Sequence, residues 1–164
     1  MDGYVKVLRR KVASWRRWPA QERRWFLPAF FLLGLARLAL LVIPFRKIAP
    51  RLGHEMKTGA VVPLASGEQM TKALNIGRAV RVAARYTPWE SKCLAQAMAA
   101  RALLGHERLP YALYLGVVRS EKAAGLEAHA WVCSGRAAVV GGRSFEGFTV
   151  VGTYVSPRLE PAPP

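Results

Sequence analysis

The feature that most constrains the fold of this chain is a change in the spacing of its apolar residues near residue 110. Before that point apolar residues recur at helical spacing, and after it they alternate, which is typical of strands. The alternation predicts strands over residues 111–119, 126–133, 136–140 and 148–154. Helices followed by a small antiparallel sheet predict an α+β fold. A length of 164 residues suits one domain.

The N-terminal part contains a long apolar stretch from Trp25 to Phe45, with Arg37 as its one charged residue. The stretch is long enough to span a membrane. However, Pro28 and Pro44 shorten the usable helix, and a central arginine is costly in hydrocarbon. We therefore expect a helical hairpin that is buried or docked on the surface of the core. A peripheral membrane contact through the Trp- and Arg-rich segment is the alternative.

A loop and then a well-marked helix follow this stretch. Residues 46–65 carry the prolines and glycines typical of loops. Ser66 and Gln69 have the spacing of a capping box, in which two side chains satisfy free amides at a helix start. We accordingly divide the chain into an N-terminal helical region over 1–65, a core over 66–156 and a Pro-rich tail over 157–164.

A second helix is predicted around Cys93, and its first residue matters for the chemistry of the thiol. Thr87, followed by a proline, has the pattern of a helix cap, and Gly105 is the expected end. Capping by Thr87 would place Cys93 in the second turn, whereas a start nearer Ser91 would place it at the terminus. Free amides and the helix dipole at a terminus stabilise a thiolate and can form an oxyanion hole.

His129 is the histidine best placed to serve as a base for Cys93. It is one of three histidines and lies in a predicted strand, with Trp131 and Cys133 on the same face. The other two histidines fall in a loop and just beyond a helix end. A strand-borne histidine and a helix-borne cysteine are the components of papain-like chemistry, in which the imidazole takes the thiol proton. Taken alone, either residue is more often ordinary packing.

Three motifs together resemble a known family, the stand-alone leader peptidases of lasso-peptide biosynthesis, which are B-type, transglutaminase-like cysteine proteases. These motifs are Trp89–Ala97 (WESKCLAQA), Leu113–Val117 (LYLGV) and Ala128–Val132 (AHAWV). The resemblance runs from about Trp25 to Tyr154. It implies a transglutaminase-like, papain-like core, with the helix-borne cysteine packed on a small antiparallel sheet and apolar helices in front.

The resemblance also implies a function. Proteins of this family cut a ribosomally made precursor peptide at the end of its leader, and a separate cyclase then joins the freed amine to an acidic side chain. The expected partners are the precursor, a separate leader-recognition-element protein and the lasso cyclase, with no nucleic acid and no cofactor. Two cysteines without a zinc-type spacing favour free thiols in a reducing cytoplasm, with membrane association through the N-terminal helices as an addition.

The chain departs from the family pattern at the third catalytic residue. The family has an Asp about a dozen positions after the histidine, but that place here falls in residues 139–142, which contain no acid. Glu146 is the best-placed acid to orient His129. Glu127, an amide, a backbone carbonyl or a simple Cys–His dyad are the alternatives. The residues expected around the cleft and the oxyanion are Trp89, Lys92, Gln96 and Trp131.

The net charge of +15 allows a rival interpretation. A non-catalytic basic protein could bind nucleic acid or an anionic membrane. Within the peptidase hypothesis, the same charge could hold an acidic leader or the partner that presents it. An arginine-rich genome would explain the charge equally well. A related enzymatic alternative is an amidase or amide transferase that uses the same Cys–His chemistry.

Overall fold

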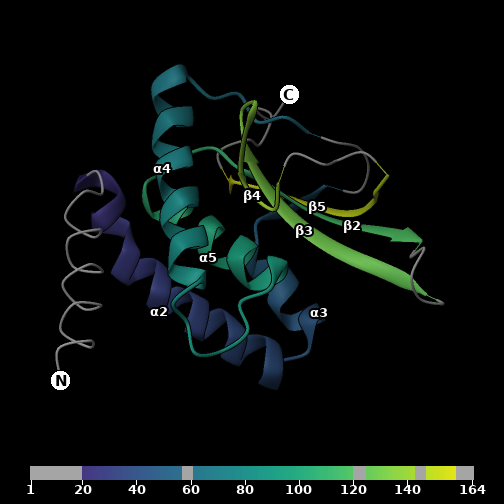
Figure 1. Cartoon of the computed structure of the whole chain (residues 1–164). Helices are drawn as coiled ribbons and strands as arrows, with labels where there is room; N and C mark the ends of the chain where they lie inside the picture. The colour runs from purple at the N-terminus through teal and green to yellow at the C-terminus, as the bar shows by residue number, and fades with distance from the viewer. Residues whose placement is uncertain (1–19, 57–60, 120–124, 143–146, 158–164) are drawn as a thin grey trace, which may run out of the picture.

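The fold places two helices against one face of a five-stranded antiparallel sheet and a third helix outside them (Figure 1). The computed structural model describes residues 20–56, 61–119, 125–142 and 147–157. The strand order is β1-β5-β2-β3-β4. The elements are α2 (Ala20–Val42), α3 (Phe45–Ile48), η1 (Ala49–Arg51), β1 (His54–Met56), α4 (Gly67–Ala84), α5 (Cys93–His106), β2 (Ala112–Arg119), β3 (Leu126–Ser134), β4 (Ala137–Val140) and β5 (Thr149–Val155). The predicted α+β fold is confirmed.

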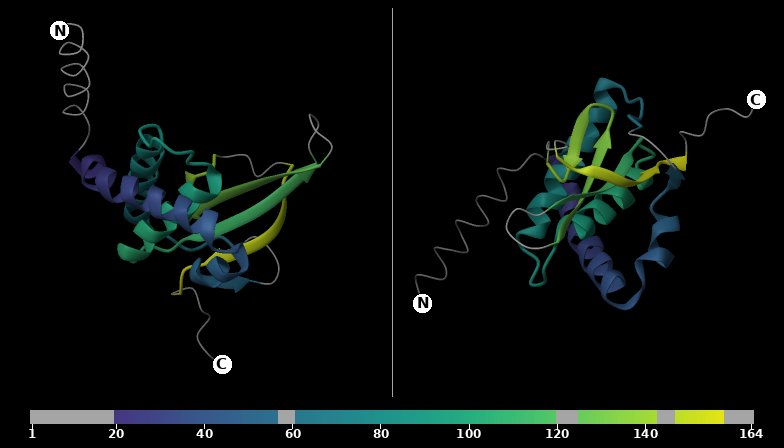
Figure 2. Two further views of the ribbon diagram at one scale, coloured as in Figure 1. Left: turned by 90° about the horizontal axis from the view of Figure 1, so that it is seen from below. Right: turned by 90° about the vertical axis from the view of Figure 1, so that its right-hand side faces the viewer.

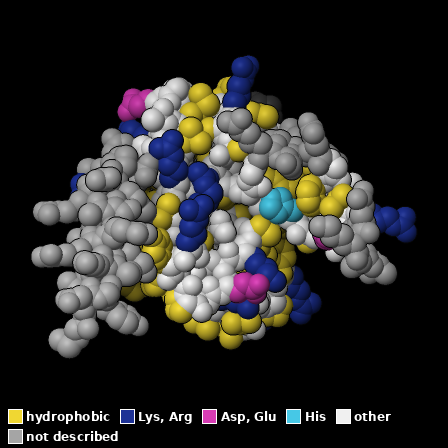
Figure 3. Space-filling model, in the orientation of Figure 1, with side chains coloured by type: hydrophobic (Ala, Val, Ile, Leu, Met, Phe, Trp, Pro, Cys, Tyr) yellow, Lys and Arg dark blue, Asp and Glu magenta, His cyan; other side chains and the backbone are white. Residues whose placement is uncertain are grey.

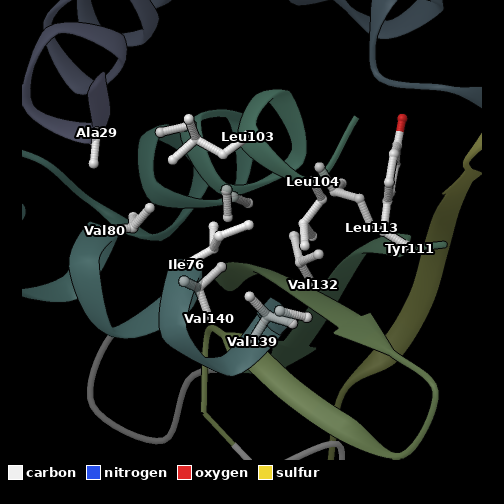
Figure 4. Packing of buried hydrophobic residues seen from close by; sticks show 14 of the residues in the cluster. Ala29, Ile76, Val80, Leu103, Leu104, Tyr111, Leu113, Val132, Val139 and Val140 are labelled. Atoms are coloured by element: carbon white, nitrogen blue, oxygen red, sulfur yellow. The ribbon is translucent and has the colours of Figure 1, made fainter. Parts of the chain in front are cut away.

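The main hydrophobic core lies between the sheet and helices α4 and α5. In Figure 4, Ile76 of α4 lies against Val140 of β4, and Leu104 of α5 points toward Val132 of β3. Helix α2 packs on the outer side of α4 and α5, as the views in Figures 1 and 2 agree. A smaller cluster covers the opposite face of the sheet and includes Trp131. The β2–β3 hairpin extends beyond the helices (Figure 2).

The apolar N-terminal stretch forms one continuous helix as far as Val42, so the predicted hairpin is wrong, whereas its expected docking on the core is confirmed. Pro28 lies inside α2. Pro44 lies between the two helices and occupies the N-cap position of α3. A proline removes one backbone hydrogen bond from a helix interior. Packing compensates here, because Ala29, Leu33 and Ala36 of α2 are almost completely buried against the core.

The predicted loop over 46–65 contains more structure than its composition indicated. It includes α3, η1 and the short strand β1, which pairs antiparallel with β5. The carbonyl of Leu52, just before β1, accepts hydrogen bonds from Tyr111 Oη at 3.0 Å and from Arg101 Nε at 3.1 Å. These long-range bonds hold the segment on the core, and no local sequence pattern signals them.

Other local predictions are confirmed. Ser66 caps α4, with Gln69 N donating to Ser66 Oγ at 3.2 Å and Ser66 N donating to Gln69 Oε1 at 2.8 Å. The four predicted strands all form, and five of their eight bounds are shifted by one residue. Helix α5 ends one residue beyond Gly105, and Arg108 takes the left-handed conformation, at φ 56°, instead of a glycine.

Gly77 permits a very close contact between a helix and the sheet. A Cβ at this position of α4 would lie 2.1 Å from the carbonyl oxygen of Val139 in β4. Real Cβ atoms do not approach a backbone oxygen so closely, so helix and strand would have to separate. We expect Gly77→Ala to lower the free energy of unfolding by about 3 kcal/mol or more, as measured by chemical denaturation.

Gly105→Ala is the matched control for that experiment. Gly105 is also helical, but a Cβ there would meet nothing within 4 Å. Because alanine favours a helix over glycine, this variant should be neutral or more stable by about 0.5–1 kcal/mol. Equal behaviour of the two variants would contradict the close contact at Gly77.

Candidate active site

Cys93 is the first residue of α5, so the thiol lies at the helix terminus. Lys92 occupies the cap position and makes no side-chain capping hydrogen bond. The amides of the first turn therefore receive no side-chain cap from Lys92, and such amides point outward from a helix start. The positive end of the helix dipole adds to their effect. Amides in this position can stabilise an oxyanion that forms beside them.

The loop that precedes Cys93 is held by its own polar groups. Thr87 Oγ1 donates to the carbonyl of Ala84 or of Trp89, each at 3.0 Å, and lies 2.9 Å from Ser91 Oγ. Gln96 Nε2 donates to the carbonyl of Ser91 at 2.8 Å. Thr87 thus stabilises the loop and does not cap α5, so the alternative with a later helix start is correct.

His129 lies in β3, at a point where β2 pairs with this strand on one side and no described strand pairs with it on the other. Strand β4 pairs with β3 only from Val132 to Ser134. The ring atom Nε2 of His129 lies 2.6 Å from the carbonyl oxygen of Gly141, just after β4. A carbonyl can only accept, so Nε2 carries the proton of this bond. In the neutral ring Nδ1 is then the unprotonated nitrogen that can act as a base.

Cys93 and His129 line the same cavity, which has a volume of about 250 Å³. Its wall is mostly apolar and comes from α3, α5, β2, β3 and β5. The two residues are 36 positions apart in the sequence numbering and come together because α5 packs against β3. The arrangement therefore brings the helix terminus that carries the thiol and the strand that carries the histidine to one cavity. The imidazole itself packs with Trp131 and Phe148, which belong to the cluster on the sheet face opposite α5.

Aromatic rings fix the position of the His129 imidazole. The ring of Trp131 lies 5.9 Å away and nearly parallel, and that of Phe148 lies 5.3 Å away. Gly116, opposite His129 on β2, leaves the room that the Trp131 ring needs, since a Cβ there would lie 2.7 Å from that ring. The imidazole therefore packs on the same side of β3 as the Trp131 ring.

The other predicted site residues lie in different places. Trp89 packs on Phe30 of α2 with ring centroids 5.3 Å apart and does not line the cavity of Cys93. The ammonium group of Lys92 lies 3.1 Å from a carboxylate oxygen of Glu90 and is exposed, so its charge is largely compensated and screened. Trp131 touches His129, as expected, but also faces a second cavity beside Cys133. Glu146 lies outside the described residues.

Two groups at the site, the carbonyl of Gly141 and the open space at Gly116, could not be singled out from the sequence, because neither belongs to a reactive side chain. The carbonyl of Gly141 is twelve positions after His129, where the family acid was sought, and a backbone carbonyl was one of several alternatives. Gly116 was visible only as part of a motif. The available signals are the glycines themselves. Gly141 comes just after a strand and Gly116 lies inside one, and a glycine at such a place indicates that another group approaches the backbone closely.

No metal site accompanies this cavity in the part of the chain that the structure describes. Groups of three or more His, Cys, Asp or Glu that could hold an ion are absent from those residues. Among the described residues that line the cavity, Cys93 and His129 carry the two side chains able to act as nucleophile and base.

A comparison with protein families finds a match over most of the chain. The model of a family described as the transglutaminase-like superfamily matches residues 39–153. The matched region contains α5, both residues of the Cys–His pair and almost the whole sheet. No curated protein and no solved structure matches the chain.

Gly141 allows a direct test of the contact that orients His129. Its φ is +89°, and a Cβ there would lie 2.4 Å from Cβ of Trp131. We expect Gly141→Ala to be less stable than wild type, and to lose reactivity at the site because the carbonyl moves. Gly142 is the matched control, since its φ is +83° but a Cβ would meet nothing within 4 Å.

Both alanine variants carry the cost of a left-handed backbone, about 1–2 kcal/mol, so the difference between them isolates the clash. We expect Gly141→Ala to lose at least about 2 kcal/mol more than Gly142→Ala in chemical denaturation. Similar stabilities would show that the Gly141 backbone can shift without cost.

The two thiols should differ strongly in reactivity. Cys133 is 7% exposed, and burial raises the pKa of its thiol to about 11. Near neutral pH it is therefore protonated as well as covered, and it becomes a thiolate only as the pH approaches that value. We expect iodoacetamide to label the folded protein only at Cys93, and to label Cys93→Ala only after unfolding. Rapid labelling of Cys133 in the folded protein would contradict this.

Proposed function

Because the chain belongs to the transglutaminase-like superfamily, whose chemistry is that of cysteine-based peptidases and transferases, we propose that it is a cysteine peptidase that removes the leader from a lasso-peptide precursor. The single observation that carries this proposal is the shared cavity of Cys93 and His129. The three sequence motifs that resemble the leader peptidases lie around this cavity. The first contains the start of α5, and the other two lie within β2 and β3.

In the proposed reaction, Nδ1 of His129 takes the proton of the Cys93 thiol, and the sulfur attacks the carbonyl carbon at the leader–core junction. The amides at the start of α5 stabilise the oxyanion of the tetrahedral intermediate. The imidazolium then protonates the leaving amine of the core peptide, and a thioester to the leader remains. Water, deprotonated by His129, hydrolyses this thioester and restores the thiol.

The neutral carbonyl of Gly141 can orient His129 but carries no full charge. A carboxylate in its place would stabilise the imidazolium more strongly. A cysteine peptidase without that carboxylate retains its nucleophile, base and oxyanion hole, which together supply much of the rate. We therefore propose a Cys–His dyad oriented by a backbone carbonyl, with Glu146 as a candidate acid in addition.

A basic groove next to this site suggests what kind of peptide it accepts. The groove has a volume of about 910 Å³, lies between α4 and β4, and is lined by Arg78, Arg81 and Arg136. It also reaches Gly142, the residue after the carbonyl that contacts His129. Figure 3 shows Lys and Arg side chains gathered over α4 and beside it. An acidic stretch of the precursor would be attracted here.

The remaining parts of the proposal rest on the family resemblance. We propose that a separate leader-recognition-element protein delivers the precursor, that a lasso cyclase uses the product, and that the reaction takes place in the cytoplasm without a cofactor. An amide transferase would use the same thioester but pass it to an amine instead of water. The mass of the peptide product distinguishes these two outcomes.

Cys93→Ala and His129→Ala should each abolish cleavage of a candidate precursor peptide encoded beside this protein's gene. The measurement is the mass of the peptide after incubation with the protein and the recognition protein. We expect wild type to release the leader, whereas loss of the nucleophile or the base should reduce the rate by at least about a thousandfold.

Cys133→Ala and His106→Ala are the matched controls, because Cys133 does not line the cavity of Cys93 and the side chain of His106 is 73% exposed. Both should cleave at nearly the wild-type rate. Cleavage that persists in Cys93→Ala would overturn the proposal. A mass increase that matches an added free amine, without release of the leader as an acid, would favour the transferase.

A further inference from the structure

Helix α2 is apolar on both faces, but only one face is covered. Ala29, Leu33 and Ala36 are buried against α4 and α5. On the opposite side large apolar side chains are mostly exposed: Leu27 58%, Phe31 66%, Leu35 62%, Leu38 57%, Leu41 66% and Val42 67%. These six residues, which form the outer face of α2, recur at three- and four-residue steps and therefore make one continuous stripe. Exposed apolar stripes of this extent mark interaction sites.

The charges that α2 and the segment after it contribute around this outer face are all positive. No Asp or Glu occurs between Arg23 and His54 in the sequence, whereas this region contains six Lys or Arg residues. Arg24 lies near one end of the stripe, and Arg46, Lys47 and Arg51 lie beyond the other, all of them exposed. An apolar stripe with cations at both ends is the pattern of a helix that lies in the interface of an anionic membrane.

An apolar cavity opens beside the same face. It has a volume of about 320 Å³ and lies between α2, the α3–η1 segment and α5. Leu35 belongs both to its wall and to the outer face, and Arg51 is the exposed cation at its edge. Such a cavity can accept part of an acyl chain while the arginine meets the phosphate of the headgroup.

We propose that the outer face of α2 docks this protein on an anionic phospholipid bilayer, with the helix parallel to the surface. By length and composition Arg23–Val42 could also cross a membrane. However, ion pairs join Arg24 to Glu107 at 3.6 Å and Arg37 to Glu90 at 3.8 Å, and the inner face belongs to the core. Spanning would remove α2 from that core, whereas surface docking preserves every contact.

A protein partner is a weaker match for the same face than a bilayer. Protein interfaces of this size usually combine an apolar centre with polar groups that form hydrogen bonds. The outer face of α2 presents aliphatic and phenyl groups, with exposed cations beyond its ends and the Arg37–Glu90 ion pair beside its middle. A fluid bilayer needs no partner groups of matching shape, since apolar side chains enter the acyl region and arginines remain among the phosphates.

The test is co-sedimentation of the full chain with vesicles of phosphatidylglycerol and phosphatidylcholine. We expect wild type to sediment with these vesicles and much less with pure phosphatidylcholine. Phe31→Glu combined with Leu38→Glu should weaken binding at least about tenfold, because charged groups would enter the apolar layer. Leu64→Glu is the control, since Leu64 is 89% exposed but lies in the loop before α4, and it should bind like wild type.

Three results would overturn the proposal. Equal binding of wild type and the Phe31/Leu38 variant would show that the outer face is not the contact. A wild-type dimer in light scattering that becomes monomeric in this variant, without vesicle binding, would assign the face to a second copy. Release from vesicles only by detergent would indicate a spanning helix. Because Cys93→Ala should bind vesicles normally, failure of the peptidase proposal would leave this test unaffected.

Discussion

The hydrogen bond between His129 and the carbonyl of Gly141 is the contact on which the candidate site depends. It selects the ring nitrogen that remains free, and it does so through backbone position alone. That position follows from β4, which α4 holds close to β3 because Gly77 lets the helix approach Val139. The glycine on α4 therefore contributes, through β4, to the orientation of the histidine on β3. Packing thus links stability to chemistry at this site.

The second half of the site depends on where α5 begins. A start four or five residues earlier would bury the Cys93 thiol within the helix and satisfy the amides around it. The hydroxyl of Thr87 does not cap such a start but binds carbonyl groups of the preceding turn and loop. The chain therefore reaches Cys93 extended, with Lys92 at ψ 175°, and the first-turn amides point outward beside the thiol. Local loop chemistry creates the reactive terminus.

Local signals predicted the fold well and the site only in part. The strands and the Ser66 capping box were visible because alternation and capping are properties of neighbouring residues. Strand β1 and the continuous α2 were missed because both depend on contacts that are distant in sequence, such as those to Leu52. The pairing of Cys93 with His129 was inferred from motifs. The carbonyl of Gly141 could not be selected, since every residue has a carbonyl and only the fold chooses one.

Helix α2 shows how one element can serve two environments. Its inner face contributes small side chains, so it lies close to α4 and α5, and its outer face contributes large ones that remain mostly exposed. This division explains why its sequence resembles a membrane span although the helix belongs to the core. It also gives part of the net charge of +15 a location, at the two ends of that face. The Arg-lined groove between α4 and β4 accounts for another part. The basic residues thus fall into two separate regions, one beside an apolar face and one that reaches Gly142, and this separation agrees with the two partners proposed above, a bilayer and an acidic peptide.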